Sequence, residues 1–278
     1  MPLILALLCC VLASFGQILS PLLAPRAVGL SGAMVALPAD PTSPLFNPAT
    51  IYDLRSIGSD MSYGTLTGDA SDRLLVAYAN PASEEGARLA TGVYVDGQFR
   101  PAPWKYYVPY FSSIWQPMSR LAMGATLRMI NEIPRNNDTL DAKWSNSIDM
   151  GILTAGSNLN FGVNVTHAFG GTSVVPKTAQ WGAALKSDNG KFNLGYQWDG
   201  DLIGGIKYSY AASHLGMEYI LGNYGMIRGG YEWSDIHRIS FGGAAGLIEG
   251  GTLLQFGWAF PTEGKAPTQW SLGFSYRI

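Results

Sequence analysis

Residues 192–198, FNLGYQW, alternate along their whole length. Phenylalanine, leucine, tyrosine and tryptophan take every second position, and Asn193, Gly195 and Gln197 take the positions between them. Because successive side chains of a β-strand point to opposite faces, this order separates an apolar face from a polar one. The stretch therefore predicts a strand with one face in an apolar environment.

The same alternation recurs in residues 159–166, 206–210 and 254–260. Units of about ten residues, separated by turn residues such as those of 187–190 (SDNG), are typical of transmembrane strands. A soluble β-sandwich also alternates, but here aromatic residues gather toward the strand ends and the polar face is small and uncharged. The sequence therefore predicts an all-β protein, a transmembrane antiparallel β-barrel.

Composition agrees with a membrane location. Charged residues make up 14% of the 278 residues, whereas an average soluble domain has about 25%. The net charge of −2 and the lack of Lys/Arg runs exclude a surface for nucleic acid. We therefore expect outer-membrane lipid, and no nucleic acid, around this chain.

The N-terminus has the pattern of an export signal. Residues 2–15 are almost wholly apolar, and small residues at Ser14 and Gly16 predict a signal peptide, 1–16, cleaved before Gln17. A buried helix of a soluble domain and a lipoprotein signal at Cys9 or Cys10 remain alternatives. Both cysteines of the chain lie in this segment, so we expect the mature protein to form no disulfide.

No later apolar run approaches the roughly 18 residues of a membrane-spanning helix. An exported chain without such helices is either a periplasmic β protein or a barrel, the non-helical structure that satisfies its backbone in lipid. The alternating strands favour the barrel, and hence the bacterial outer membrane.

Residues 56–278 contain more strand candidates than a barrel needs. The candidates are 56–65, 71–80, 87–96, 105–116, 120–131, 145–155, 157–168, 178–187, 191–200, 202–211, 213–221, 224–233, 236–246, 250–260 and 268–278. Because single-chain bacterial barrels have an even number of strands, we expect about 14. We expect the surplus candidate in the Pro-rich region 101–117. The polar insertions 131–143 and 170–177 are predicted extracellular loops.

The last strand carries a second signal, at Ser271, Gly273, Tyr276 and Ile278. A polar residue, a glycine and then apolar residues up to the end of the chain resemble the C-terminal recognition signal of outer-membrane barrels. The resemblance implies that the barrel-assembly machinery is a partner.

Residues 26–50, RAVGLSGAMVALPADPTSPLFNPAT, break the alternation. Four prolines, each fixing φ and removing a backbone donor, prevent a strand ladder here. An apolar run that cannot join the sheet needs another place to pack. We therefore predict an N-terminal plug, or hatch, over 17–55 inside a barrel formed by 56–278. A periplasmic linker is the alternative, because proline and small residues also form linkers.

Single residues of this stretch form a motif: Arg26, Gly29, Gly32, Asp40, Asn47, Pro48 and Ala49. Their order resembles the N-terminal signature of the FadL-like outer-membrane β-barrel proteins, and especially their PorV/PorQ branch. Residues 147–153 (SIDMGIL) are similar to a mid-chain Asp-x-Gly strand of PorV-like proteins, whereas Thr50 and Ile51 depart from the pattern. The resemblance implies a fourteen-stranded barrel with a plug that has a structural or gating role.

Catalytic and metal-binding patterns are not found in the sequence. His167, His214 and His237 lack metal-ligand spacing, and the glycines of 242–246 fit a tightly packed strand better than a phosphate loop. We therefore predict that the protein is not an enzyme and binds no cofactor or metal.

Two functions follow from the resemblance. The first is a binding or accessory role in type IX-like protein secretion, with secretion-system components or secreted cargo as partners. The alternative is a FadL-like passive channel for hydrophobic small molecules. Inward faces composed mostly of Gly, Ser, Asn and Gln favour secretion, and a plug that seals rather than gates.

Overall fold

The computed structural model describes residues 24–54, 56–66, 72–81, 88–96, 104–134, 142–170, 177–202, 211–248, 250–263 and 268–278. The predicted signal peptide and its alternatives lie outside these residues.

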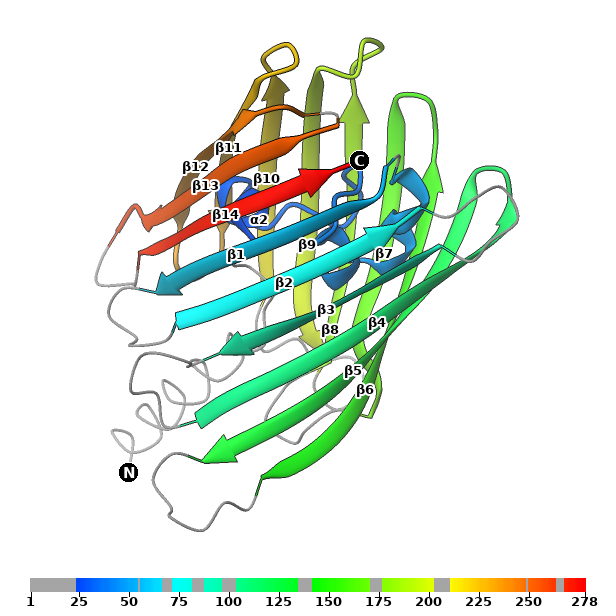
Figure 1. Ribbon diagram of the computed structural model, residues 1–278, viewed down its shortest axis with the longest axis vertical. Helices are drawn as coiled ribbons and strands as arrows, with labels where there is room; N and C mark the ends of the chain where they lie inside the picture. Colours follow the sequence, from blue (N-terminus) through cyan, green and yellow to red (C-terminus); the bar gives the residue numbers. More distant parts are fainter. Residues whose placement is uncertain are drawn as a thin grey trace.

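The strands form one closed antiparallel barrel, in which each strand pairs with its neighbours in sequence and β1 pairs with β14 (Figure 1). The strands are β1 Gly58–Leu66, β2 Asp72–Asn80, β3 Leu89–Asp96, β4 Trp104–Met118, β5 Leu121–Pro134, β6 Lys143–Ala155, β7 Leu159–Gly170, β8 Lys177–Lys186, β9 Phe192–Leu202, β10 Ala211–Ile220, β11 Gly225–Trp233, β12 Arg238–Gly246, β13 Thr252–Pro261 and β14 Gln269–Arg277. The predicted fold class, an antiparallel barrel of 14 strands, is confirmed.

The prediction that the surplus strand candidate lies in residues 101–117 is wrong. The Pro-rich region 101–117 supplies most of β4, which pairs with β3 through Pro109 opposite Val93. For the candidate 202–211, the first residue belongs to β9 and the last to β10, and these two strands pair directly with each other, so the barrel has no strand between them. Residues 203–210, with the alternation noted at 206–210, lie outside the described part of the chain.

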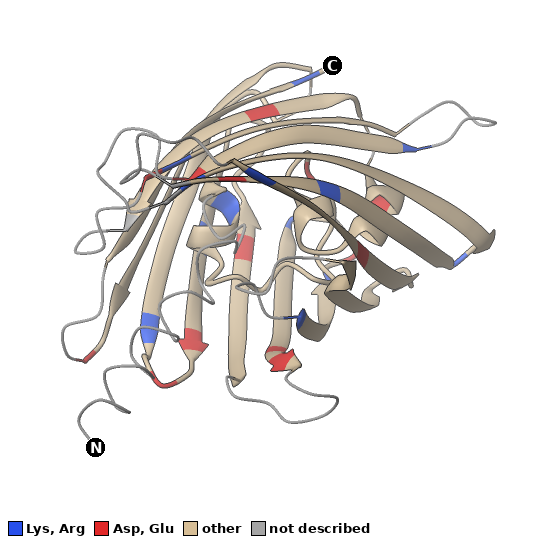
Figure 2. Ribbon diagram, turned by 90° about the horizontal axis from the view of Figure 1, so that it is seen from below, with Lys and Arg blue, Asp and Glu red and all other residues tan. Residues whose placement is uncertain are grey.

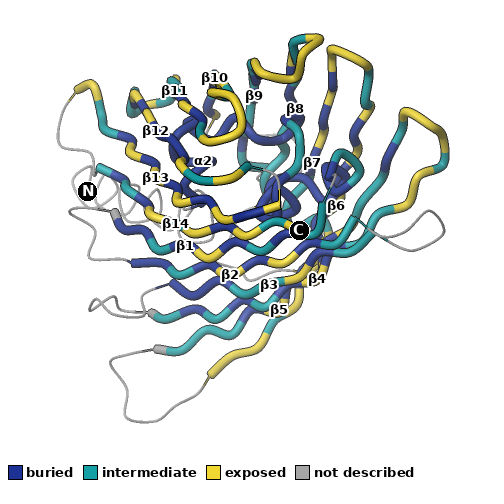
Figure 3. Tube along the Cα trace, turned by 45° about the horizontal axis from the view of Figure 1, so that its top comes forward, coloured by how far each residue is buried: buried dark blue, intermediate teal, exposed yellow. Residues whose placement is uncertain are grey.

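The two faces of the strands separate as the alternation predicted. In β9 the residues Asn193, Gly195 and Gln197 are buried inside the barrel, whereas Phe192 on the other face is exposed. Figure 3 shows buried and exposed residues alternating along the strands. Large apolar side chains such as Phe161 and Trp258 cover the outer face, as a lipid environment requires.

The two predicted loops lie at one end of the barrel. The connections from β5 to β6 and from β7 to β8 both follow odd-numbered strands, so they share an end in an antiparallel barrel. Residues 135–141 and 171–176 within them are outside the described ranges.

Residues 24–54, here called the inner segment, lie within the barrel (Figure 2). They form a short helix, α2 Pro25–Gly29, and two 3-10 turns, η1 Ser43–Leu45 and η2 Pro48–Asp53. Almost every residue from 24 to 51 is buried. None of the helices in the described part of the chain is long and apolar enough to cross a membrane.

Candidate functional site

The inner segment packs against a row of glycines on the barrel wall, here called the glycine belt. Where a Cβ is placed on these residues, it falls 2.0 to 3.1 Å from atoms of the inner segment. The belt consists of Gly124, Gly151, Gly162, Gly182, Gly195, Gly216, Gly230, Gly242, Gly257 and Gly273, one on each strand from β5 to β14. The small inward residues thus leave room for backbone to lie directly against the wall.

Asn47 joins the inner segment to this belt. Its Nδ2 donates to Val35 O (2.8 Å) and to Ile152 O of β6 (3.2 Å), and its Oδ1 accepts from Ala49 N (3.0 Å). A Cβ on Gly151 would lie 2.0 Å from Asn47 Oδ1. The Asp-x-Gly strand therefore has its glycine at the place where Asn47 meets the wall.

Pro48 and Ala49 continue from Asn47 into η2. Asn47 is the N-cap, with extended backbone as expected for a residue before proline, and Pro48 occupies the first turn. Both Pro48 and Ala49 pack on Gly124 of β5. These three residues fix one end of the inner segment against β5 and β6.

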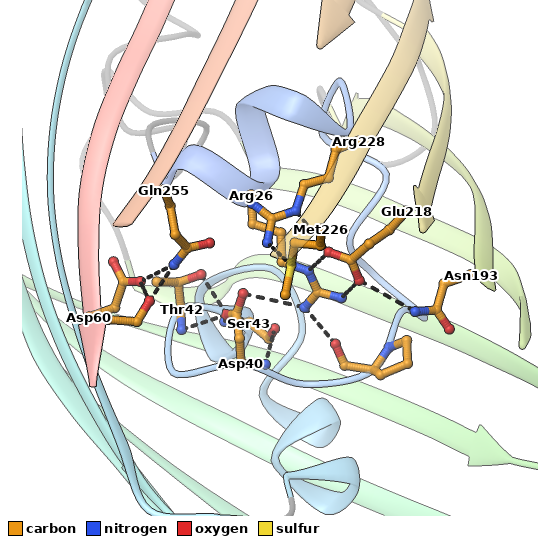
Figure 4. Close-up of polar contacts among 12 residues, drawn as sticks. Arg26, Asp40, Thr42, Ser43, Asp60, Asn193, Glu218, Met226, Arg228 and Gln255 are labelled. Carbon is orange, nitrogen blue, oxygen red and sulfur yellow. Dashed lines mark hydrogen bonds and ion pairs between the residues drawn. The ribbon is translucent and has the colours of Figure 1, made fainter. Parts of the chain in front are cut away.

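Arg26 holds the other end through charge (Figure 4). Its guanidinium donates from Nε and Nη2 to the two oxygens of Glu218 on β10 (3.2 and 3.1 Å). Nη1 donates to Pro38 O (2.7 Å) and Asp40 Oδ2 (3.3 Å). Glu218 also accepts from Arg228 Nε of β11 (2.8 Å). One arginine thus links α2, the loop before η1 and the barrel wall.

Asp40 organises the loop before η1. Its Oδ1 accepts from Thr42 N (2.8 Å), Thr42 Oγ1 (2.7 Å) and Ser43 N (2.9 Å). Burial alone would raise the pKa of Asp40, but the charge of Arg26 and the bonds from Thr42 outweigh it and hold that pKa below its ordinary value. Burial likewise disfavours the charged form of Arg26, yet Glu218 and Asp40 raise the pKa of Arg26. Arg26 and Asp40 are therefore both charged at neutral pH.

Gly29 and Gly32 serve different needs. A Cβ on Gly29 would lie 3.2 Å from the Cα of Gly242 on β12, so two backbones meet there. Gly32 has φ of 88°, which favours glycine, and follows Ser31 at φ 51°. The chain turns at these two residues and leaves α2 along the wall.

Hydrogen bonds between side chains of the barrel wall and the backbone of the inner segment, here called tethers, hold this segment over β7 to β12. Gln197 Oε1 of β9 accepts from Met34 N and Val35 N (both 2.9 Å). The other tethers are Asn160 Nδ2 to Ala36 O (3.2 Å), His214 Nδ1 to Ser31 O (2.6 Å) and Ser240 Oγ to Gly29 O (3.1 Å). They satisfy backbone groups that no sheet ladder reaches.

Part of the opposite side of the lumen is apolar. The strands β2, β3 and β4 bury the Arg73–Asp96 ion pair and Ser112, but most of their buried inward residues are apolar. Six of these, here called the apolar wall, are Leu75, Ala77, Tyr94, Tyr106, Val108 and Tyr110. They form one buried cluster with Leu45, Phe46 and Ala49 of the inner segment. The expectation that the inward faces are mostly Gly, Ser, Asn and Gln is therefore wrong for these strands, and the preference for secretion that rested on it loses its basis.

The four C-terminal signal residues lie at the seam where β14 meets β1. Ser271 and Gly273 face inward, and Gly273 packs on Pro25 of the inner segment. Tyr276 faces outward, and Ile278 N donates to Ile57 O (3.0 Å). Recognition of these residues by the barrel-assembly machinery remains a prediction, as do the boundaries 17–55 of the plug and its gating role.

The sequence predicts that Asp149, Lys207 and Glu218 are lumen-facing charges that brace a plug rather than form a selectivity filter. Glu218 pairs with Arg26 of the inner segment, and Asp149 pairs with Arg128, which donates to Leu45 O (3.0 Å). Arg228 was not found from the sequence, where it looks like an ordinary residue of an alternating strand. Lys207 lies outside the described ranges. Within those ranges, no group of three or more His, Cys, Asp and Glu is placed to hold a metal ion.

Comparison with known proteins identifies the fold. No family model and no curated protein matches the chain. Among solved structures, the CymD monoaromatic hydrocarbon channel aligns with a TM-score of 0.68 at 12% identity, over 92% of this chain and 97% of that one. The toluene transporter TodX of Pseudomonas putida aligns with a TM-score of 0.68 at 10% identity, over 91% of this chain and 97% of that one. The chain thus has the FadL-like barrel fold of these channels, and its place in the PorV/PorQ branch remains a prediction.

Proposed function

We propose that the protein is a passive outer-membrane channel for small hydrophobic molecules. The observation that carries this proposal is the asymmetry of the lumen. The inner segment is held by hydrogen bonds over β7 to β12, and its residues Leu45, Phe46 and Ala49 pack on the apolar wall of β2 to β4.

An apolar solute that passes between the inner segment and the apolar wall exchanges one set of apolar contacts for another. Leu75 and Ala77 line this side on β2, and Leu45 and Phe46 line it on the inner segment. The tethers to Gln197 and Asn160 on the other side stay intact. Burial of apolar surface is worth roughly 25 cal/mol per Å², so the solute binds here more favourably than in water.

The structural neighbours named as hydrocarbon channels support this proposal, because their barrels align with nearly the whole chain. No contact in the described residues specifically favours a role in secretion. Passive transfer also needs no catalytic group, in agreement with the predicted lack of enzymatic activity.

Uptake of p-xylene by intact Gram-negative cells tests the proposal. Cells are required because a phospholipid liposome is itself permeable to an apolar solute, whereas lipopolysaccharide is a barrier. Cells with the protein should take up p-xylene faster than cells with an empty vector. Equal rates would reject the proposed function.

A matched pair of variants tests the route. Ala77→Trp fills the space beside the inner segment, because Ala77 faces inward and is fully buried. Val76→Trp adds a similar side chain to the lipid face of the same strand, where Val76 is 39% exposed. Uptake should fall with Ala77→Trp and persist with Val76→Trp. Equal uptake by both variants would reject passage along the apolar wall.

A further inference from the structure

The strand β7 contains a bulge that the barrel itself does not require. Pairing with β6 shifts register between Ile148 and Met150, so the residues around His167 outnumber those opposite them. His167 has φ of 53°, a left-handed conformation that is uncommon for any residue except glycine. Regular pairing resumes at Phe169, opposite Ile148, and the next residue, Gly170, also has positive φ, 71°.

The bulge turns His167 into the lumen. Asn160, Gly162 and Asn164 face inward, so strict alternation would place residue 167 on the lipid face. Instead His167 is only 3% exposed. Bulges of this kind often re-aim a side chain beside a functional site.

Backbone contacts explain how the strained conformation is held. His167 N donates to Asp149 Oδ1 (2.8 Å), and Asp149 Oδ2 accepts from Arg128 Nε (2.6 Å). These bonds need no imidazole, because any residue at position 167 has the same backbone N–H. The left-handed conformation is less costly for glycine, so histidine must be explained by its side chain.

The imidazole has unused hydrogen-bonding capacity. His167 Nδ1 is buried without a partner in the part of the chain that the structure describes, and so is Ser147 Oγ, two residues before Asp149 on the inward face of β6. Tyr110 OH, on the strand next to Arg128, is also buried and unpaired among the described residues. Leaving such groups unpaired is costly, so each calls for an explanation.

These groups lie beside the apolar wall. Arg128 Nη1 donates to the hydroxyl of Tyr94, a member of that wall (3.3 Å). Tyr110 and Ser147 are the direct strand partners of Arg128 on β4 and β6. A solute at the apolar wall therefore has neutral hydrogen-bonding groups next to its path.

We propose that His167, together with Ser147, binds the hydroxyl group of a hydrophobic cargo molecule, so that the channel prefers phenol-like compounds to the corresponding hydrocarbons. The inference rests on the proposed function and specifies its substrate class. The unpaired groups of His167, Ser147 and Tyr110 can each donate or accept a hydrogen bond, as a hydroxyl does.

A carboxylate cargo fits this site less well. The guanidinium of Arg128 is already used by Asp149, Tyr94 OH and Leu45 O. The other cation near His167 in the described ranges, Lys177, is exposed and donates to Ala168 O (3.2 Å), whereas the negative charge of Asp149 lies beside the site. The site therefore selects neutral polar groups.

Uptake of p-cresol and p-xylene, two molecules of nearly equal shape, tests the proposal in intact cells. His167→Gly removes the imidazole and suits the positive φ, so the backbone bond to Asp149 is kept. His167→Asn also tolerates this conformation and keeps a side chain that can hydrogen-bond. Ser147→Ala removes the second group and leaves the bulge untouched. Heat-modifiable migration on gels confirms that each variant has assembled.

The ratio of p-cresol uptake to p-xylene uptake should fall about 3- to 10-fold in His167→Gly, because the variant loses one hydrogen bond to the hydroxyl group of p-cresol. It should fall less in His167→Asn. If His167→Gly does not assemble, Ser147→Ala provides the same comparison. An unchanged ratio, or an equal loss of both solutes, would overturn the proposal while the proposed function stands.

A binding measurement separates this inference from the proposed function. If neither solute enters faster than in empty-vector cells, the channel function fails. The protein in detergent is then titrated with p-cresol while the imidazole NMR signals are recorded, with the signal of His167 assigned by its loss in His167→Gly. A shift of that signal with p-cresol and not with p-xylene supports the subsite, and no shift overturns it.

Discussion

Replacing Arg26 with methionine should release the inner segment from the barrel wall. Arg26 joins α2 to both Glu218 of β10 and Asp40 of the loop before η1. Methionine keeps much of the aliphatic length and removes the charge. The change leaves Glu218 with Arg228 and leaves Asp40 with its bonds from Thr42.

The magnitude follows from burial. The side chain of Arg26 is 7% exposed and those of Glu218 and Asp40 are 5% exposed, so solvent screens these pairs little. Removing one partner of a buried ion pair costs about 3–5 kcal/mol. We expect the lower end, about 3 kcal/mol, because both carboxylates keep other partners. Since 1.36 kcal/mol is a factor of ten, the ratio of released to seated segment should rise about 160-fold.

A buried thiol reports this release. Val28 is 1% exposed on α2, so in a background without Cys9 and Cys10 the substitution Val28→Cys gives a thiol that a polar maleimide reaches only after opening. When reclosing is fast, the labelling rate follows the opening equilibrium. The rate should rise by about two orders of magnitude with Arg26→Met.

Arg73→Met is the matched control. Arg73 pairs with Asp96 between β2 and β3, at the same 7% and 5% exposure, within the barrel wall. It should lower the stability of the barrel without a comparable rise in labelling at position 28. An unchanged rate with Arg26→Met, or an equal rise with Arg73→Met, would refute the role of Arg26 as the link between the inner segment and the wall.

Three further predictions concern other parts of the molecule. Gly151→Ala should displace Asn47, because Asn47 Oδ1 would lie 2.0 Å from the new Cβ. It should lower the free energy of urea unfolding by about 1–3 kcal/mol. The control Gly229→Ala, where the nearest atom is 3.8 Å from the new Cβ, should leave that free energy nearly unchanged. Because the pKa of Asp40 lies below its ordinary 3.8, its contribution to stability is complete above about pH 3.8 and is lost as the pH falls through the lowered value. Asp40→Asn should therefore flatten the loss of stability below that pH, and an unchanged urea midpoint profile would contradict this. Deletion of residues 276–278 should abolish heat-modifiable protein in outer-membrane fractions, and its persistence would reject the assembly signal.

The barrel was predictable because strand alternation is a local property. The alternation in residues 192–198 and 254–260 needs only neighbouring positions, and β9 and β13 contain those residues. Pairing is not local, so the surplus segment 202–211 could not be told from a strand. Pro109 suggested that the strand is interrupted, yet this proline lies opposite Val93 in the pairing of β4 with β3. The pairing of β4 with β5 also keeps its register across Pro109, at Tyr107 before it and Tyr110 after it.

The apolar wall was missed for a different reason. Residues 74–79, LLVAYA, are apolar on both faces of the strand. No alternation therefore shows which of the two faces points into the barrel. Arg26 and Glu218 of the charge cluster were each predicted to act in the lumen, but their pairing could not be predicted, because they are 192 positions apart in the sequence. The motif at residues 47–49 was visible, but its partner Gly151 could be named only once the wall was in place.

The lumen can exclude ions and still pass apolar solutes, because the two properties depend on different sides of the inner segment. A hydrated ion gains nothing from the apolar wall and would have to displace the backbone from the glycine belt or break tethers such as those of Gln197. An apolar solute needs only the side chains of the apolar wall to part from Leu45 and Phe46, which leaves the hydrogen bonds from Gln197, Asn160, His214 and Ser240 intact. The belt and the charge cluster therefore favour exclusion of ions, and the apolar wall favours hydrophobic solutes. On this argument Arg26→Met should raise ion leakage more than p-xylene uptake, because it loosens the side that seals.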